Sequence, residues 1–192
     1  MTQPSAPFRL TICGLDELPE LAGAGVTHVI SILDPGYPDP PVFKSYDPHS
    51  RIVLRFDDVI ADGEGYSAPT PDDVSGILSV GEQLIAQPVD HLLIHCHAGV
   101  SRSTATAALL LAQRDPDDAG AVFQTIRAVR PRSWPNSRIV RMGDAQLGLG
   151  GRLVDGMTEH HAAVAEAFPD LAAMLRLGMR AHEVPALRPR RA

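Results

Sequence analysis

The feature that most constrains the fold of this chain is an apolar run that stops at a cysteine and is followed by a segment rich in alanine and leucine. Residues 91–95 form the run, Cys96 ends it, and residues 103–113 form the second segment. A short apolar run between polar residues is typical of a buried strand, and the second segment has the composition of a helix. The sequence therefore predicts that Cys96 lies at a strand-to-helix turn.

The residues between Cys96 and Arg102 have the composition of an anion-binding loop. A glycine and a serine allow successive backbone N–H groups to turn inward at the N-terminus of the following helix. Arg102 adds a planar fork of donors that fits two oxygens of a phosphate, and its charge favours the thiolate form of Cys96. We therefore expect Cys96 to be a nucleophile, and phosphate, sulfate or vanadate to bind in the loop. The residues expected to bind the substrate together with Arg102 are His97, Ala98, Gly99, Val100 and Ser101.

The pattern His95-Cys96-x5-Arg102-Ser103 resembles the signature of the cysteine-dependent protein tyrosine phosphatase superfamily. Its flanks resemble the dual-specificity-like branch, and the resemblance extends over about residues 8 to 148. A lone cysteine after a strand is most often a small buried hydrophobic residue, but here a glycine, an arginine and a hydroxyl residue stand in register with it. The resemblance implies a phosphocysteine intermediate in which Ser103, or alternatively Ser101, donates a hydrogen bond to the departing thiolate. It also implies that no metal and no other cofactor takes part.

The resemblance further implies a general acid on the loop after the strand predicted over residues 51–56. A carboxylic acid within reach of the leaving-group oxygen protonates that oxygen as it departs. Asp58 matches the family pattern best, because it closes the strand and precedes the apolar pair Val59-Ile60. Asp57 and Asp62 on the same segment are the alternatives.

Two further residues are expected to support the loop. His95 precedes the nucleophile and either orients the loop through a hydrogen bond or is a buried histidine without a proton role. Asn136 stands in a second family-like motif, Arg130-Pro131 followed by Pro135-Asn136, and is predicted to cap the next helix and to brace the loop. That helix carries Asp144 where dual-specificity members have a glutamine, so the role of the glutamine in positioning water is not transferred.

Composition limits the other classes of function. The chain has 192 residues, 44% of them hydrophobic, which is enough for one sizeable core. The net charge of -6 does not favour binding to nucleic acid or to an anionic membrane. Cys13 and Cys96 lack metal-type spacing, and the adjacent His160 and His161 face different directions on a helix, so neither a disulfide framework nor a metal site is indicated. Residues 1–7 lack the pattern of a signal sequence and no run is long enough for a membrane span, which predicts a soluble, cytoplasmic protein.

Strands that alternate with helices predict an α/β fold with a central, largely parallel sheet flanked by helices. The proline-rich segment 34–41 is interpreted as a plain surface connector, and residues 160–177 predict an extra C-terminal helix. The predicted organisation is a phosphatase domain over residues 1–150, followed by a C-terminal extension over residues 151–192 that ends in a basic tail, residues 188–192.

The predicted activity is the hydrolysis of phosphate monoesters, with protein phosphotyrosine as the first substrate and dual specificity as a variant of it. Val100 favours phosphoprotein, because family members that act on phosphoinositides tend to have a lysine at that position. The alternatives are a phosphatase of a small-molecule or phosphoinositide phosphate, a pseudophosphatase that only binds phosphorylated partners, and a rhodanese-like sulfurtransferase. A pseudophosphatase is expected to lack the cysteine or the arginine, and the spacing from Cys96 to Arg102 favours phosphate over sulfur transfer.

Overall fold

A computed structural model describes residues 8–178 and 180–185 of the chain. The N-terminal residues 1–7 and the basic tail 188–192, about which predictions were made above, lie outside the described residues. Four parallel strands form one sheet in the order β1-β4-β2-β3. The strands are β1 (Arg9–Cys13), β2 (His28–Leu33), β3 (Ser50–Arg55) and β4 (His91–His95). The predicted α/β fold with a parallel central sheet is confirmed.

β4 lies between β1 and β2, and all of its residues are buried. Its Ile94 pairs with Ile12 of β1 and with Ile30 of β2. Parallel strands that are covered on both faces have continuous apolar sequences, which explains why the apolar run before Cys96 occupies the interior of the sheet. Because the strands all run in one direction, Cys96 lies at the same edge of the sheet as the residues that follow β2 and β3.

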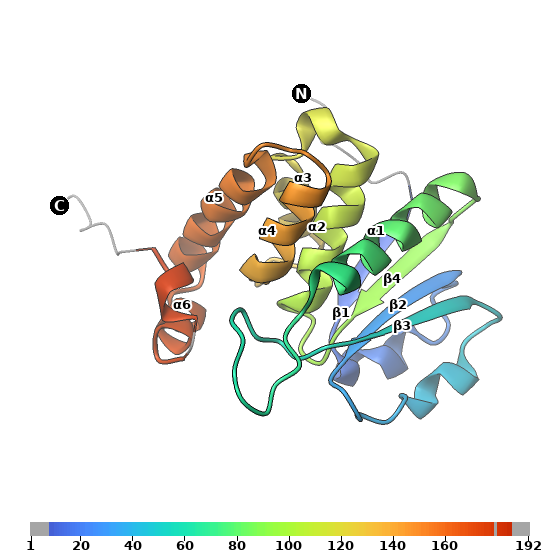
Figure 1. Cartoon of the computed structure of the whole chain (residues 1–192). Helices are drawn as coiled ribbons and strands as arrows, with labels where there is room; N and C mark the ends of the chain where they lie inside the picture. Colours follow the sequence, from blue (N-terminus) through green and yellow to red (C-terminus); the bar gives the residue numbers. More distant parts are fainter. Residues whose placement is uncertain (1–7, 179, 186–192) are drawn as a thin grey trace.

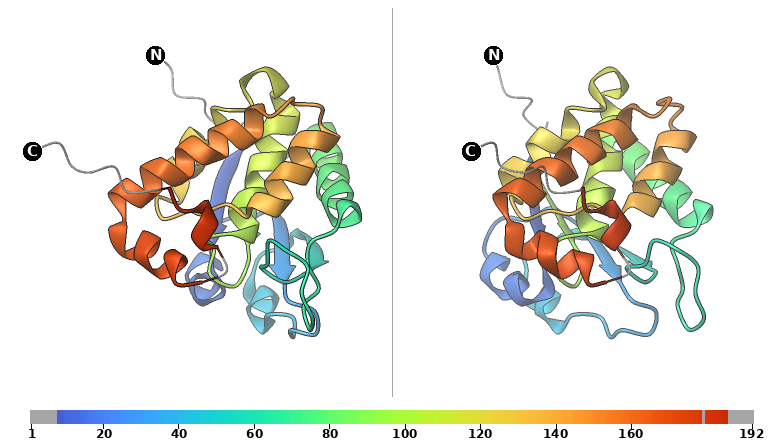
Figure 2. Two further views of the ribbon diagram at one scale, coloured as in Figure 1. Left: turned by 60° about the vertical axis from the view of Figure 1, so that its left-hand side comes forward. Right: turned by 90° about the vertical axis from the view of Figure 1, so that its left-hand side faces the viewer.

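Helices cover one face of the sheet, as Figures 1 and 2 show, and the main core lies between them and the strands. They are α1 (Pro71–Ala86), α2 (Arg102–Arg114), α3 (Val122–Val129), α4 (Ser137–Gln146) and α5 (Arg152–Ala167), and α6 (Pro169–Arg176) follows. A smaller core on the opposite face packs under the 3-10 helices η1 (Leu15–Leu21) and η2 (Pro41–Ser45). No helix in the described part of the chain combines the length and apolar character of a membrane span.

The C-terminal region differs from the single helix predicted over residues 160–177. α5 ends before Phe168, and α6 begins at Pro169. Proline lacks an N–H donor and disfavours helical backbone in the residue before it, and Phe168 accordingly has φ −131° and ψ 73°. The prediction of one continuous helix is therefore wrong. Leu153 at the start of α5 belongs to the main core, whereas α6 packs with Trp134 in a separate cluster. The division of the chain at residue 150 stays a prediction.

Candidate active site

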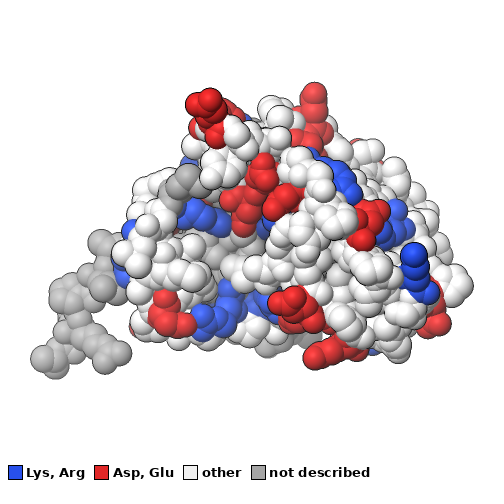
Figure 3. All heavy atoms as spheres, turned by 90° about the horizontal axis from the view of Figure 1, so that it is seen from below, with Lys and Arg blue, Asp and Glu red and all other residues white. Residues whose placement is uncertain are grey.

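Cys96 directly follows β4, and a tight loop leads from it to the start of α2. Gly99 in this loop has φ +68°, and a Cβ atom on it would lie 2.3 Å from the carbonyl carbon of Cys13. The left-handed backbone and the close approach both require glycine at this position. The loop packs on the segment after β1, where the N–H of Leu15 donates to the carbonyl of His97 at 2.9 Å. Figure 3 shows the molecule from below the view of Figure 1, which is the side at which the strands end. Acidic and basic side chains are interspersed there around a central hollow.

An arginine and a glutamate brace the outside of the loop. Arg130 donates to the carbonyl oxygens of Ala98 and Gly99 at 3.0 and 3.1 Å. Both terminal nitrogens of Arg130 are held by Glu17 at 2.7 and 2.8 Å, and this hydrogen bonding lowers the pKa of the Glu17 carboxyl. Because a planar peptide unit directs its N–H opposite to its C=O, holding these carbonyls outward turns the N–H groups of Gly99 and Val100 inward. Sequence reasoning missed this pair, since nothing local to Glu17 marks it as a partner of a residue so distant in the chain.

The thiol of Cys96 faces the hydroxyl of Ser103 on the first turn of α2. Their Sγ and Oγ atoms are 3.2 Å apart, and both residues are buried, with Cys96 only 2% exposed. The serine is thus within hydrogen-bond reach of the sulfur, as the predicted role requires. Ser101, the alternative, directs its hydroxyl to Asp58 instead.

Arg102 is 3% exposed, and part of its guanidinium is held in place by the protein. Its Nη1 donates to Asp34 Oδ1 and to the carbonyl of Phe56, both at 2.6 Å. Its buried Nε has no hydrogen-bond partner among the described residues, so it is a free donor for a bound anion. Asp34 also lies 3.6 Å from Nε2 of His97. Segment 34–41 is therefore more than the plain connector predicted above, because its first residue positions Arg102.

Two of the three candidate acids are occupied away from the loop. Asp57 accepts the backbone N–H of Ser67 at 2.7 Å and so closes the base of the segment that follows β3. Asp62 forms an ion pair with Arg138 of α4 at 2.9 Å. Both contacts fix the shape of this segment.

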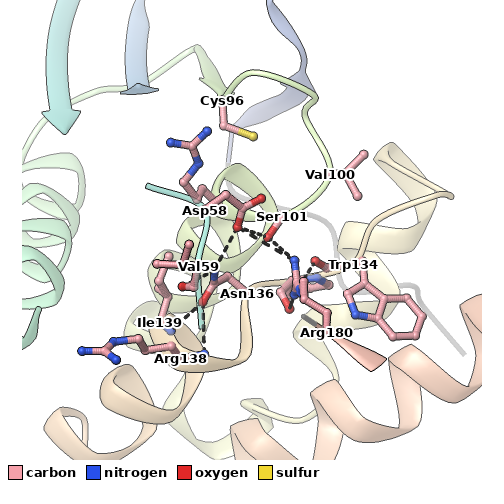
Figure 4. Close-up of polar contacts among 12 residues, drawn as sticks. Asp58, Val59, Cys96, Val100, Ser101, Trp134, Asn136, Arg138, Ile139 and Arg180 are labelled. Atoms are coloured by element: carbon pink, nitrogen blue, oxygen red, sulfur yellow. Dashed lines mark hydrogen bonds and ion pairs between the residues drawn. The ribbon is translucent and has the colours of Figure 1, made fainter. Parts of the chain in front are cut away.

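Asp58 is the candidate acid that the structure brings to the loop. Its Oδ1 accepts hydrogen bonds from the Ser101 hydroxyl at 2.6 Å and from Asn136 Nδ2 at 2.9 Å (Figure 4). Asn136 also accepts the N–H groups of Arg138 and Ile139 through its own side-chain oxygen, and so caps α4. One asparagine thereby joins the start of α4 to the acid and to the loop.

The side chain of His95 is fully buried and has partners on both ring nitrogens. Nε2 lies 2.6 Å from the hydroxyl of Ser31, and Nδ1 lies 3.4 Å from the carbonyl of Cys96. Burial lowers the pKa of His95 to about 4, so its ring is neutral at physiological pH. Of the two interpretations, this geometry favours a buried histidine that orients the backbone at Cys96.

Val100 is the loop residue on which the predicted preference for phosphoprotein rests. Its carbonyl accepts the N–H of Trp134 at 2.8 Å, and its side chain packs against the cluster around that tryptophan. Figure 4 shows Val100 on the side of the loop that faces Trp134. The side chain at this position therefore contributes apolar packing and no charge.

No metal site is formed by the described residues. No group of three histidine, cysteine, aspartate or glutamate side chains within residues 8–178 and 180–185 is arranged to hold an ion. The ring centroids of His160 and His161 are 6.3 Å apart. His160 bonds to Ser133, and His161 stacks on Trp134 with ring centroids 4.1 Å apart. Each histidine thus has its own structural partner.

Comparison with solved structures finds the same fold in dual-specificity phosphatases. The phosphatase domain of Yvh1 from Chaetomium thermophilum gives a TM-score of 0.54 at 17% identity, covering 78% of this chain and 96% of that chain. Human DUSP28 gives 0.53 at 18% identity, covering 72% of this chain and 94% of that chain. Tk-PTP in its active form gives 0.53 at 18% identity, covering 77% and 99%. No family model and no curated protein matches the sequence. The predicted resemblance to dual-specificity-like phosphatases is confirmed at the level of the fold.

Proposed function

We propose that the chain is a phosphatase that hydrolyses phosphate monoesters, protein phosphotyrosine foremost, through a phosphocysteine intermediate. The observation that carries the proposal is the meeting of three groups at one loop: the Cys96 thiol, the free Nε of Arg102, and the Asp58 carboxyl group bonded to Ser101. A nucleophile, an anion-binding group and a proton donor are what the hydrolysis of a phosphate monoester requires. The fold shared with dual-specificity phosphatases supports the same conclusion.

In the first step, the thiolate of Cys96 attacks phosphorus in line with the leaving oxygen, so that an S–P bond forms as the P–O bond breaks. The inward N–H groups of the loop and Nε of Arg102 hold the other three oxygens, over which the negative charge is spread in the transition state. Because Cys96 is almost completely buried, a phosphate at the end of a long side chain reaches it most easily. This supports phosphotyrosine over phosphoserine.

The hydrogen bonds around Asp58 determine which of its oxygens carries the proton. Ser101 and Asn136 both donate to Oδ1. An oxygen that accepts two hydrogen bonds has no room for a proton of its own, so the acid form carries the proton on Oδ2. Within the described residues, no hydrogen bond is made to Oδ2. That proton is therefore available to the oxygen of the leaving group.

In the second step, water attacks the phosphocysteine and the S–P bond breaks. The Asp58 carboxylate, which lost its proton in the first step, takes one from the attacking water. The hydroxyl of Ser103, 3.2 Å from Sγ, donates to the departing thiolate. Inorganic phosphate leaves, and the Cys96 thiolate and the protonated Asp58 are restored as at the start of the first step.

The test of this function is Cys96→Ser, assayed on a chromogenic aryl phosphate. We expect turnover to be lost and vanadate binding to remain, because the hydroxyl is a far poorer nucleophile while the loop N–H groups and Arg102 are unchanged. Cys13→Ser is the matched control, since it alters the other buried cysteine and should leave turnover per folded molecule intact. Turnover at the wild-type level in Cys96→Ser would refute a phosphocysteine mechanism.

The substrate class is tested with a panel of phosphotyrosine, phosphoserine and phosphothreonine peptides, a nucleotide and phosphoinositides. Phosphoinositides belong in the panel because PTPMT1, with a TM-score of 0.50 at 15% identity, was solved in complex with PI(5)P. The apolar side chain of Val100 offers no charge to a second phosphate, which supports phosphoprotein as the substrate. Higher kcat/KM on a phosphoinositide than on every peptide would overturn the proposed substrate but not the mechanism.

A further inference from the structure

An arginine from the C-terminal end of the described chain reaches the candidate active site. Arg180 precedes the short 3-10 helix η4 (Ala181–Glu183), and its side chain is 12% exposed. Its Nη1 donates to the hydroxyl of Ser101 at 2.6 Å, and its Nη2 donates to the carbonyl of Pro135 at 3.0 Å. Its Nε donates to Glu183 at 2.6 Å. All three nitrogens of the guanidinium are therefore engaged, which holds the side chain in one position.

The contact with Ser101 sets the direction of a hydrogen-bond chain. A serine hydroxyl has one hydrogen to donate, and it can accept at the same time. Arg180 can only donate, so the Ser101 oxygen accepts from it and the Ser101 hydrogen goes to Oδ1 of Asp58, 2.6 Å away. Nη1 of Arg180 is itself 3.9 Å from that oxygen of Asp58. Figure 4 shows the Arg180 side chain directed toward Ser101 and Asp58.

Glu183 anchors Arg180 from the opposite side. Its side chain is 3% exposed and accepts hydrogen bonds from Nε of Arg180 and from the indole N–H of Trp134 at 3.0 Å. Burial by itself raises the pKa of Glu183, but the charge of Arg180 and hydrogen bonds from Arg180, Ser137 and Trp134 outweigh it, so the pKa lies below the usual value of 4.5. The carboxylate is thus ionised near neutral pH and balances the charge of the arginine.

We propose that Arg180 is a positioning residue for the general acid, supplied to the active site by the C-terminal segment 180–184. By orienting the Ser101 hydroxyl toward Oδ1, Arg180 keeps the Asp58 carboxyl group turned so that Oδ2 faces the leaving group. Without Arg180, the hydroxyl is free to rotate and Asp58 keeps Asn136 as its fixed donor. This inference rests on the proposed function, and it makes residues beyond 150 part of the catalytic arrangement.

The test compares aryl phosphates with basic and acidic leaving groups, because only the basic ones depend strongly on a positioned acid. Arg180→Met should lower kcat/KM for the basic leaving group by about 10- to 100-fold and for the acidic one by about 2-fold or less. Vanadate affinity should stay within about 3-fold of wild type, because the loop N–H groups and Arg102 are untouched. The matched control is Arg132→Met, which removes an exposed ion pair to Asp170 of α6 at 2.7 Å and should leave the ratio of the two rates unchanged.

Arg180→Met leaves the Glu183 carboxylate buried without its cation, so this variant can lose its fold. The double variant Arg180→Met/Glu183→Gln removes both charges and should show the same selective loss. Ser101→Ala should show it too, and adding Arg180→Met to Ser101→Ala should then cost little more, because both substitutions break one chain of hydrogen bonds.

A folded double variant whose two rates fall equally, or do not fall, would overturn the positioning role. Additive effects of the Ser101 and Arg180 substitutions would overturn it as well. Failure of the proposed phosphatase function can be distinguished from failure of the Arg180 role. In the former case the wild-type protein itself would not turn over the aryl phosphate with the acidic leaving group.

Discussion

Four histidines are buried and have a lowered pKa, and the three with the largest shifts should make the folded protein sensitive to mild acid. Burial lowers the pKa of His95 and His160 to about 4 and that of His161 to about 3, from a usual value of 6.5. The unfolded chain therefore takes up protons at a higher pH than the folded one. The stability that depends on these neutral rings is present above pH 6.5 and is lost as the pH falls from there toward 4.

The magnitude follows from proton uptake by the unfolded chain. Between pH 7 and pH 5.5, an imidazole that titrates normally when unfolded and stays neutral when folded destabilises the fold by about 1.2 kcal/mol. Three such rings give about 3–4 kcal/mol, a large part of the 5–15 kcal/mol typical of a folded domain. Carboxyl groups with a lowered pKa, such as Glu183, act below their usual value of 4.5 and so outside this pH window.

The measurement is urea unfolding at pH 7 and pH 5.5 at constant ionic strength, followed by the fluorescence of Trp134. This is the single tryptophan of the chain, it is fully buried, and it stacks on His161 with an interplanar angle of 3°. His161→Phe keeps an aromatic ring in the stack but cannot titrate, so the difference in stability between the two pH values should shrink by about 1.2 kcal/mol. Replacing the exposed His182 with glutamine should leave that difference as in wild type. An unchanged difference in His161→Phe would refute the reasoning.

Other predictions concern the acid, the loop, a helix cap and metal dependence. Asp58→Asn should slow aryl phosphates with basic leaving groups by about 10²–10⁴-fold, whereas Asp57→Asn and Asp62→Asn should keep the wild-type dependence on leaving-group pKa. If one of the latter loses it instead, the acid is misassigned. Gly99→Ala should abolish vanadate binding in calorimetry, because its Cβ would meet backbone at 2.3 Å; binding at wild-type affinity would contradict the loop geometry. Asp144→Ala should lower the free energy of unfolding by about 1–2 kcal/mol, because the carboxylate accepts the N–H groups of Gly151 and Leu153 at the start of α5; Asp144→Asn should lower it by less. EDTA should not reduce turnover, and vanadate should inhibit it; activity lost on chelation and restored by a divalent metal would point to other chemistry.

Local patterns predicted the parts of the site that lie within a few residues of each other. The apolar run before Cys96 is typical of a strand that is buried on both faces of a parallel sheet, and the spacing to Arg102 leaves room for one tight loop, so strand, loop and helix follow from one stretch. The cap on α4 was equally local, because Asn136 accepts the N–H groups of Arg138 and Ile139, two and three residues after it in the chain.

Partners from distant parts of the chain could not be predicted in this way. Glu17 and Arg180 are 113 and 79 residues from the groups they bind, and a single sequence holds no local signal for such pairs. Asp144 shows a different limit. The sequence assigned it no role, because the role of the family glutamine was not transferred to it, but the carboxylate accepts the N–H groups of Gly151 and Leu153 at 2.7 and 2.9 Å and so stabilises the start of α5. Only the fold brings the end of α4 to that helix.

The charges around the loop bear on how a protein with net charge -6 would bind phosphate, as proposed above, without a basic surface. Three arginines meet at the site, and each is paired with a carboxylate. The pairs are Arg102 with Asp34 at 2.6 Å, Arg130 with Glu17 at 2.7 Å, and Arg180 with Glu183 at 2.6 Å. What remains to attract an anion is the inward N–H groups, the N-terminus of α2 and the Nε–H of Arg102, all of which act over a few ångströms. For the proposed phosphatase, we therefore expect selection of the substrate to depend on which phosphate fits into the loop, with little contribution from attraction at a distance.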